Sequence, residues 1–430
     1  MEQTTFSIES IDVFKKKALV WAQSFSVFCA LDSNEYTQDP YAQFEFVLAV
    51  DALDTFSATS NSFEQLEAYR QQKASYLFGY LGYDLKNEIE DLQTTHTDTF
   101  DFPDMYFFEP RYILQIDKKN KLSINRNYPE AFAIYEMIQS MPLDMPTAQN
   151  AIELQSKITR EAYLEKIKRI QQHIIEGDIY ELNFCRELYA TEIELHPLAI
   201  YFQLNDTAKA PFSSFFKINE QYILCASPER FLQKKGNQLL SQPIKGTVKR
   251  GESMEEDAFL QSELYHSEKE RAENIMIVDL VRNDLTHFAE TGSIQVKELF
   301  GIYTFNTVHH MISSITATLK DTTKYVQAIK KAFPMGSMTG APKIRAMQLI
   351  DTYEESKRGV FSGSIGYFTP ENDFDFNVVI RTILYHQKNK YLSIQSGGAI
   401  THDSIPEAEW NELNLKSAVI QKILKGKTHE

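Results

Sequence analysis

Residues 376–396, "FNVVIRTILYHQKNKYLSIQS", indicate the fold class of this chain. It holds two apolar runs, 376–385 and 391–396, rich in the β-branched and aromatic residues that are typical of strands. Only residues 386–390 separate the runs, and so short a connection joins antiparallel neighbours but cannot carry a parallel crossover. The stretch therefore predicts neighbouring antiparallel strands.

The same pattern recurs along the chain. "QYILCAS" (221–227) and "GSIGYF" (363–368) are also strand-like. Helical segments alternate with these runs, near 268–282, 341–356 and 407–424. Successive strands with short connections and separate helices predict an α+β protein, with antiparallel sheets packed by helices.

A seam divides the sequence into two regions. At 430 residues and 43% hydrophobic content, the chain can bury a large core. The proline-containing stretch "SMPLDMPTAQN" (140–150) separates an aromatic, strand-rich beginning from a more regular remainder. We expect an amino-terminal sheet-rich subdomain over 1–145 and a second region, which carries the chemistry, over 151–425.

Composition indicates which partners and which cell compartment to expect. A net charge of −15, from 44 basic and 59 acidic residues, argues against a nucleic-acid partner. The beginning of the chain does not resemble a secretory signal, and no apolar run approaches the roughly 20 residues of a membrane helix. Cys29, Cys185 and Cys225 show no paired spacing, which argues against disulfides and thiolate metal sites. We expect a cytoplasmic protein with no membrane contact.

A helix and a strand are predicted just after the seam. "ITREAYLEKIKRIQQHIIEG" (158–177) has apolar residues at helical spacing, with Thr159 as a plausible N-cap and Gly177 as a stop. "IYELNFCREL" (179–188) then alternates apolar and polar residues, which predicts a half-buried strand.

Two predicted helices carry glutamates at a spacing of three residues. In "SEKERAENIMIVDLVRND" (267–284), Glu270 and Glu273 lie about 60° apart around the helix axis, so both can address one point. In "DSIPEAEWNELNLKSAVIQKILKG" (403–426), Glu409, Glu412 and Lys416 share one face. Two such pairs form a hard-oxygen environment that favours Mg²⁺, although each pair alone is also typical of a solvated helix face.

The limits of these helices are also predicted. Ser404 followed by Glu407 reads as a capping box, and Pro406 suits the first turn. Asn283 and Asp284 are expected to cap the end of the earlier helix.

Candidate groups for binding an anion are dispersed. Arg381 interrupts an apolar strand, and Lys343 follows Pro342 at a helix start. Gly397 and Gly398 can let backbone amides approach a ligand. Two alternatives stay open: Arg381 can form an internal salt bridge, and the glycines can belong to an ordinary strand-end turn.

Three further residues are candidates for chemistry. Lys245 in "SQPIKGTVKRG" (241–251) lies between a proline and a glycine, so it is either ordinary surface or a fixed amine. Glu229 in "ASPERF" and His310 in "TVHHMISS" are acid–base candidates, although single residues of these types are more often structural.

Together these segments resemble the chorismate-utilising enzymes. The resemblance is dense over residues 155–425 and fainter in "LDSN" (31–34) and "FGYLGYDL" (78–85). The matching segments, in family order, are "GDIY", "SPERF", "PIKGT", "AENIMIVDLVRND", "VHHMISSI", "FPMGSMTGAPKIRAM", "GSIGY", "IRT" and "DSIPEAEWNE".

This resemblance implies a fold and a site. The fold has large antiparallel β-sheets packed against each other and covered by helices, with chorismate bound by region 151–425. The implied ligands of Mg²⁺, which grips the ring carboxylate of chorismate, are Glu270, Glu273, Glu409 and Glu412. The implied substrate-binding residues are Thr247, His310, Ser337, Arg381, Gly397, Gly398 and Lys416.

Lys245 implies a branch of the family. Anthranilate-forming members typically carry alanine there, whereas a lysine in "PIKGT" is similar to the branch that makes 4-amino-4-deoxychorismate for folate. In that chemistry Lys245, as a neutral amine, adds to C2 of chorismate, Glu229 protonates the departing hydroxyl, and ammonia enters at C4. Desolvation or a neighbouring positive charge is expected to lower the pKa of the lysine.

The resemblance also implies a partner. No segment resembles a glutaminase or a lyase, so ammonia is expected from a separate glutamine amidotransferase subunit. Two alternatives stay open: an anthranilate-forming enzyme, and a catalytically silent subunit that binds chorismate or the amidotransferase. Three residues depart from the family pattern, namely Glu181 for glutamine, Phe361 for tyrosine and Ala399 for glycine.

Overall fold

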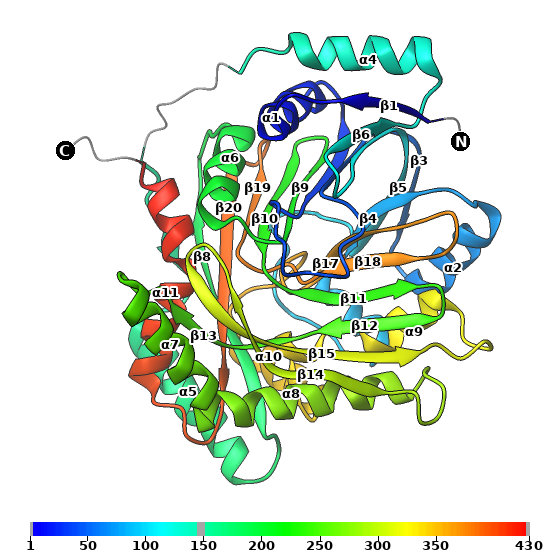
Figure 1. Ribbon diagram of the computed structural model, residues 1–430. Helices are drawn as coiled ribbons and strands as arrows, with labels where there is room; N and C mark the ends of the chain where they lie inside the picture. Colours follow the sequence, from blue (N-terminus) through cyan, green and yellow to red (C-terminus); the bar gives the residue numbers. More distant parts are fainter. Residues whose placement is uncertain (1–2, 144–150, 427–430) are drawn as a thin grey trace.

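The computed structural model describes residues 3–143 and 151–426 (Figure 1). The predicted boundary between 145 and 151 lies outside these residues. The strands are β1 Thr4–Ser7, β2 Val27–Asp32, β3 Phe46–Ala58, β4 Leu77–Leu81, β5 Met105–Ile116, β6 Lys121–Ile124, β7 Gln155–Ser156, β8 Glu181–Ala190, β9 Phe212–Ile218, β10 Gln221–Ser227, β11 Arg230–Lys235, β12 Gln238–Gln242, β13 Ile244–Lys249, β14 Gln295–Thr304, β15 Val308–Thr318, β16 Gly340–Ala341, β17 Ser364–Phe368, β18 Phe374–Asn377, β19 Thr382–His386 and β20 Tyr391–Ile400. The helices are α1 Ile11–Ala22, α2 Ser62–Gln72, α3 Lys86–Ile89, α4 Tyr128–Ser140, α5 Arg160–Ile175, α6 Pro197–Ala208, α7 Met254–His266, α8 Glu268–Thr286, α9 Tyr325–Ala332, α10 Lys343–Tyr353 and α11 Pro406–Leu424, with short 3-10 turns η1 Tyr83–Leu85 and η2 Gly336–Met338.

The described strands pair in one long antiparallel ladder. Starting at β8, the pairing runs through β20, β19, β10, β9, β2 and β3 to β5. From β5 it continues through β4, β17, β18, β11 and β12 to β15, which also pairs with β13 and β14. Strands from before the predicted seam thus lie in the middle of the ladder, and strands from after it form both ends.

The ladder folds over so that its two halves enclose a buried apolar layer. Cys29 of β2 and Phe216 of β9 belong to one buried cluster with Ile365 and Tyr367 of β17. The prediction of antiparallel sheets packed against each other is confirmed. Burial of this apolar surface is the main force that holds the halves together.

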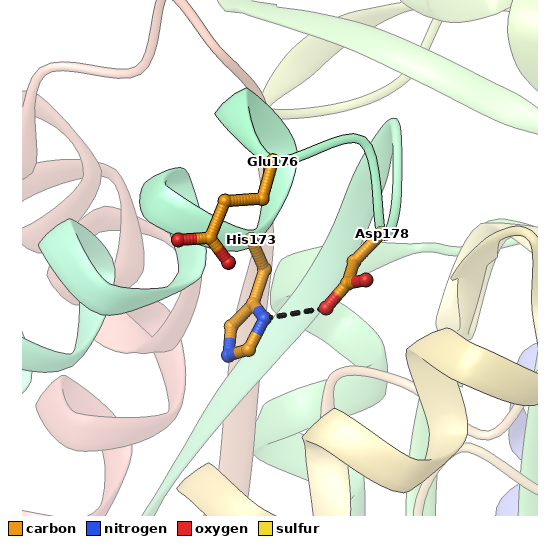
Figure 2. A group of neighbouring side chains, drawn as sticks. All are labelled: His173, Glu176 and Asp178. Atoms are coloured by element: carbon orange, nitrogen blue, oxygen red, sulfur yellow. Dashed lines mark hydrogen bonds and ion pairs between the residues drawn. The ribbon is translucent and has the colours of Figure 1, made fainter.

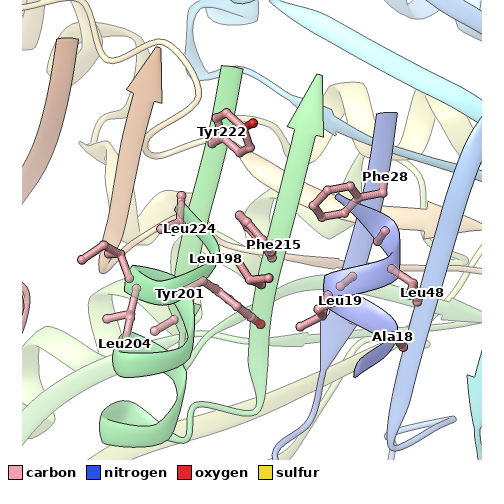
Figure 3. Close-up of a cluster of buried hydrophobic side chains, with 14 of the residues drawn as sticks. Ala18, Leu19, Phe28, Leu48, Leu198, Tyr201, Leu204, Phe215, Tyr222 and Leu224 are labelled. Carbon is pink, nitrogen blue, oxygen red and sulfur yellow. The ribbon is translucent and has the colours of Figure 1, made fainter. Parts of the chain in front are cut away.

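Helices cover the outer faces of both halves. Figure 3 shows α1 and α6 lying on β2, β3, β9 and β10, with Leu198 and Leu204 of α6 beside Leu224 and Phe215 of the sheet. On the other half, the core cluster joins α2, α8 and α9 to β11, β12 and β15. Among the described helices, none is long and apolar enough to cross a membrane.

The predicted helix after the seam is confirmed with its caps. α5 begins after Thr159, whose hydroxyl accepts a hydrogen bond from the backbone N–H of Ala162 at 3.2 Å. It ends before Gly177, which has φ +82° and so takes the left-handed conformation that ends helices. The helices predicted near 268–282, 341–356 and 407–424 are α8, α10 and α11.

The structure corrects three local predictions. The run 376–385 is two strands, β18 and β19, because residues 378–381 leave the ladder and Arg381 has φ +52°. β8 is buried on both faces rather than half-buried, because Leu182 and Phe184 pack with α5 and α10 on one face and Asn183 contacts Ser337 and Met338 of η2 on the other. The capping box is wrong: the hydroxyl of Ser404 donates to Glu409 at 2.7 Å, although Pro406 does lie in the first turn of α11.

Candidate active site

The two ends of the strand ladder meet at Lys245. This lysine lies on β13 at one end of the ladder, and its Nζ is 3.4 Å from Oε1 of Glu181 on β8 at the other end. Their side chains are 11% and 1% exposed, so the alternative that Lys245 is ordinary surface is wrong.

The protonation of Lys245 differs from the prediction. Burial lowers the pKa of its ammonium, but the carboxylates of Glu181 and Glu273 more than offset this, so the pKa is raised above its usual value. The lysine therefore rests as an ammonium ion, not as the neutral amine that the sequence led us to expect.

Glu229 lies beside this lysine, in the turn between β10 and β11. The residue is 4% exposed, and Oγ of Ser337 donates a hydrogen bond to its Oε1 at 2.7 Å. Burial raises the pKa of Glu229 to about 7, although Ser337, Lys245 and Arg381 all lower it. A carboxyl group that titrates near neutrality can hold a proton and release it, as a general acid must.

His310 links two of the predicted substrate-binding residues. Nη2 of Arg381 donates to Nε2 of His310 at 2.8 Å, so that nitrogen is unprotonated and Nδ1 donates to Oγ1 of Thr247, also at 2.8 Å. Burial, with Arg381 as the nearest charge, keeps the pKa of His310 well below its usual value. His310 is therefore neutral and orients the guanidinium.

Arg381 is left without a carboxylate partner. No Asp or Glu oxygen of the described residues lies within 4.0 Å of its guanidinium, so the alternative of an internal salt bridge is wrong. Burial lowers the pKa of Arg381 to about 10. A half-buried arginine with no carboxylate within ion-pair distance in the described chain can receive an anionic group of a ligand.

The two predicted glutamate pairs face each other across the site. Lys269, at the start of α8, interacts electrostatically with all four carboxylates, those of Glu270, Glu273, Glu409 and Glu412. Burial raises the pKa of Glu270 and Glu409, and that of Glu273 to about 7. Only Glu412 has a lowered pKa, because Lys416 lies 2.7 Å away. The pairs are therefore not ordinary solvated helix faces.

These glutamates fit a hard cation. Oε1 of Glu273 is buried and accepts no hydrogen bond from the described residues, which is costly unless a ligand or ion satisfies it. A Cβ placed on Gly398 would lie 3.4 Å from Oε2 of Glu409 and 3.9 Å from Oε1 of Glu412, so the glycine keeps the space between them open. Carboxylate oxygens are the donors that suit Mg²⁺, and Nζ of Lys416, 3.8 Å from the same Cβ position, lies beside them.

The neighbouring glycine has a different role. A Cβ on Gly397 would lie 2.3 Å from Sγ of Cys185, so close packing of β20 on β8 requires glycine there. Both glycines lie inside β20, so the alternative of a strand-end turn is wrong. The carbonyl oxygen of Gly397 accepts a hydrogen bond from Nζ of Lys416 at 2.9 Å, which holds that lysine at the site.

Another cluster brings three possible ligand atoms within 4.8 Å of one another in the described chain: His173, Glu176 and Asp178, at the end of α5 (Figure 2). Its atoms are already engaged. His173 contacts Asp178 at 2.8 Å and the hydroxyl of Tyr353 at 2.9 Å, and Arg345 donates to Asp178 at 2.9 Å. The cluster is a hydrogen-bonded helix end, separate from the glutamates.

Two residues differ from their predicted roles, and one was missed. Lys343 begins α10 as predicted, but its Nζ lies 2.6 Å from Asp284, so it is not free to bind an anion. Asp284 lies inside α8, which continues to Thr286, and does not cap its end. Lys269 was missed, although its position four residues before Glu273 was a signal that the two could interact.

Comparisons with known proteins agree with this geometry. A family model described as chorismate binding enzyme matches residues 26–422. Aminodeoxychorismate synthase component 1 of Bacillus subtilis is 33% identical over 360 residues, which cover 80% of this chain and 76% of that protein. The chloroplastic aminodeoxychorismate synthase of Arabidopsis thaliana is 40% identical over 282 residues, covering 65% of this chain.

The lengths of these relatives differ, and a solved structure extends the comparison. This chain spans only 30% of the Arabidopsis protein. The crystal structure of anthranilate synthase component I from Streptococcus pneumoniae superposes with a TM-score of 0.78 and 26% identity, covering 90% of this chain and 94% of that one. With a family model matched over nearly its whole length, the chain belongs to the chorismate binding enzyme family.

Proposed function

We propose that this protein is the synthase component that aminates chorismate with ammonia to 4-amino-4-deoxychorismate, on the route to 4-aminobenzoate and folate. The observation that carries the proposal is Lys245, a buried amine 3.4 Å from one carboxylate and electrostatically coupled to Glu229, a carboxyl group that titrates near neutrality. An enzyme in which ammonia attacked chorismate directly would not need a buried lysine at this position.

The residues divide the reaction into two substitutions. Nζ of Lys245 attacks C2 of chorismate, the ring double bond shifts, and the C4–O bond breaks as Glu229 gives its proton to the departing hydroxyl. Ammonia then attacks C4, and the C2–N bond breaks to release the lysine. Glu229 suits the first step because its pKa of about 7 leaves it partly protonated at neutral pH.

Positive groups and a cation hold the substrate in this proposal. Arg381 and Lys416 receive carboxylate groups, and Thr247, Ser337 and the Gly397–Gly398 backbone define the walls. Mg²⁺ held by Glu270, Glu273, Glu409 and Glu412 would neutralise and grip the ring carboxylate. His310 lies near the ring, fixed as the neutral tautomer by its two hydrogen bonds.

Ammonia comes from a separate glutamine amidotransferase subunit, and the pair works in the cytoplasm. The name of the Bacillus subtilis relative supports a partner, because that protein is called component 1. The second candidate function is anthranilate synthesis, which the similarity to the Streptococcus pneumoniae structure favours.

Products distinguish the two candidates. The protein is given chorismate, Mg²⁺ and an ammonium salt, and the products are separated by chromatography with mass detection. We expect 4-amino-4-deoxychorismate without pyruvate, because the lysine route adds nitrogen at C4 and retains the side chain. Anthranilate with pyruvate would establish the second candidate instead.

Lys245→Ala is the matched variant. Without ammonia, the unmodified protein is expected to gain the mass of dehydrated chorismate on the peptide that contains residue 245. The variant should form no adduct and lose most of its amination rate, on the order of 10³-fold, because it lacks the nucleophile. An equal adduct on both proteins would contradict the assignment of Lys245.

A further inference from the structure

We propose that Glu181 takes the proton from the Lys245 ammonium ion as the lysine attacks chorismate, so that Glu181 acts on the reaction through Lys245. This inference rests on the proposed function. It assigns a role to a residue at which the chain departs from the family pattern, where glutamine is usual.

The geometry singles out Glu181 as the proton acceptor. Oε1 of Glu181 is 3.4 Å from Nζ of Lys245, and within the described residues no other carboxylate lies within 4.0 Å of that amine. Oε2 of Glu181 is buried and accepts no hydrogen bond from the described residues. The carboxylate is thus directed at the lysine and is not committed to any other group.

The backbone holds both members of the pair in place. Glu181 begins β8 and pairs with Ala341 of β16, and its neighbour Leu182 pairs with Ile400 of β20. Lys245 lies in a bulge of β13, between Ile244, which pairs with Ile312 of β15, and Thr247, which pairs with His310. Because both strands are anchored in the ladder, the two side chains remain opposite each other.

Other acidic groups around Lys245 have different tasks. Glu229 must already hold a proton, since it donates one to the departing hydroxyl. The remaining carboxylates that interact with Lys245 lie on the helices of the proposed cation site: Glu270 and Glu273 on α8, and Glu412 on α11. By elimination, Glu181 is the carboxylate free to accept.

An acceptor is needed because Lys245 rests as an ammonium ion. A lysine amine is already protonated at neutral pH at its usual pKa. Burial lowers the pKa of Lys245, but Glu181 at 3.4 Å and the other carboxylates more than offset this, so almost none of the amine is neutral at neutral pH. In the proposed step, the N–H proton moves to Glu181, the freed electron pair forms the C2–N bond, and the C4–O bond breaks with the proton from Glu229. When ammonia displaces the lysine, the released amine takes a proton from the new C4 ammonium group. The resting state is restored when Glu181 gives its proton to solvent and Glu229 takes one from solvent, so no net proton is gained or lost.

The test compares Glu181→Gln with Glu181→Asp as matched control. Adduct formation at Lys245 is measured by acid quench and mass spectrometry, without ammonia and with saturating Mg²⁺, between pH 5.5 and 7.5. Each rate is divided by the rate of the unmodified protein at the same pH, which cancels the titration of Glu229 and Glu273. Glutamine is the residue usual in the family, so that variant is expected to fold.

The expected result is a difference in pH dependence. For Glu181→Gln the ratio should be well below one at low pH and rise about tenfold per pH unit, because the amine must then lose its proton to solvent. For Glu181→Asp the ratio should not change with pH, because a carboxylate remains. A ratio for Glu181→Gln that does not change with pH would overturn the proposal. A ratio above one at every pH would also overturn it, because it would show that Glu181 only stabilises the ammonium form of Lys245.

A second measurement separates this proposal from the proposed function. Trace labelling of Lys245 with acetic anhydride across pH, without chorismate, reports its protonation, and Glu181→Gln should shift labelling to lower pH. One outcome is that the labelling shifts in Glu181→Gln while the unmodified protein never forms an adduct. That result would show that the ion pair exists, but it would refute the attack by Lys245 and therefore the role of Glu181. If labelling does not shift, the role of Glu181 is refuted even where the adduct forms.

Discussion

Two buried ionic clusters in this molecule contrast with each other. In the amino-terminal region, Nζ of Lys15 lies 2.8 Å from both Asp32 and Glu45. The remaining acceptor capacity of these carboxylates is used by the Ser33 hydroxyl and by the backbone N–H groups of residues 34 and 35. At the active site, Lys245 meets one carboxylate at 3.4 Å, and oxygens of Glu181 and Glu273 accept no hydrogen bond from the described residues.

The two clusters differ in whether their buried charges are fully paired. A closed cluster in which each charge is paired and hydrogen-bonded can be part of a stable core. An open cluster leaves buried charges partly unsatisfied, which costs stability unless a ligand completes it. We infer that the first cluster serves the fold and the second serves substrate and cation.

The largest expected effect comes from breaking the open cluster. Glu273→Gln and Glu412→Gln should each lower turnover by about 10³-fold or more, because each removes a charge that the proposed Mg²⁺ requires. Neither should lower the melting temperature, since Glu273 already lacks a hydrogen-bond partner at Oε1 and Glu412 lies at the site edge.

The measurements are turnover against Mg²⁺ concentration and thermal unfolding of the same samples. Glu407→Gln is the matched control, because Glu407 is on α11 but pairs with Arg160 at the surface. Full activity of Glu273→Gln in chelator-treated protein would refute the cation site.

Breaking the closed cluster should affect stability instead. Lys15→Met leaves Asp32 buried without a cation and leaves Glu45 with only Lys118 at 3.5 Å, which should lower the free energy of unfolding by about 3–5 kcal/mol. Without Lys15 the pKa values of both carboxyl groups in the folded state rise, so the variant should regain stability as the pH falls from 7 toward 5.

Urea unfolding at several pH values measures this deficit. The control is Lys16→Met, whose half-exposed ion pairs with Asp12 and Asp206 should contribute less than about 1 kcal/mol. Equal losses for the two variants would remove the contrast between closed and exposed charges.

The smallest expected effect is a change in the pKa of Glu229. Ser337 donates a hydrogen bond that stabilises the charged carboxylate, so Ser337→Ala should raise the pKa of Glu229 from about 7 by less than about one unit. Because the protonated form of Glu229 is the proposed acid, the rate of adduct formation should fall as the pH rises through its pKa. For Ser337→Ala, this fall should occur at a higher pH than for the unmodified protein.

The pH profile of adduct formation without ammonia measures the shift, since ammonia itself titrates in the alkaline range. Ser337→Thr retains a hydroxyl and serves as the control. A shift of the Ser337→Ala profile to lower pH would contradict the role assigned to this hydrogen bond.

The fold class, the four helices α5, α8, α10 and α11, and the chemical types of the site residues could be predicted from the amino-acid sequence. Apolar runs with short connections report local backbone preferences, and the strands they predict do pair antiparallel. Helical spacing placed Glu270 beside Glu273 and Glu409 beside Glu412, because neighbours on one helix are fixed by its geometry. The family followed from short motifs, and the match over 26–422 confirmed it.

Which of these groups meet, and in what charge state, depends on how the chain folds. The pair Lys245–Glu181 joins opposite ends of the strand ladder, so no local pattern could predict it or the raised pKa of the lysine. The hydroxyl of Ser404 turned from its own helix end to Glu409 for the same reason. Burial and electrostatic environment depend on contacts between distant segments, and those contacts form only when the chain is folded.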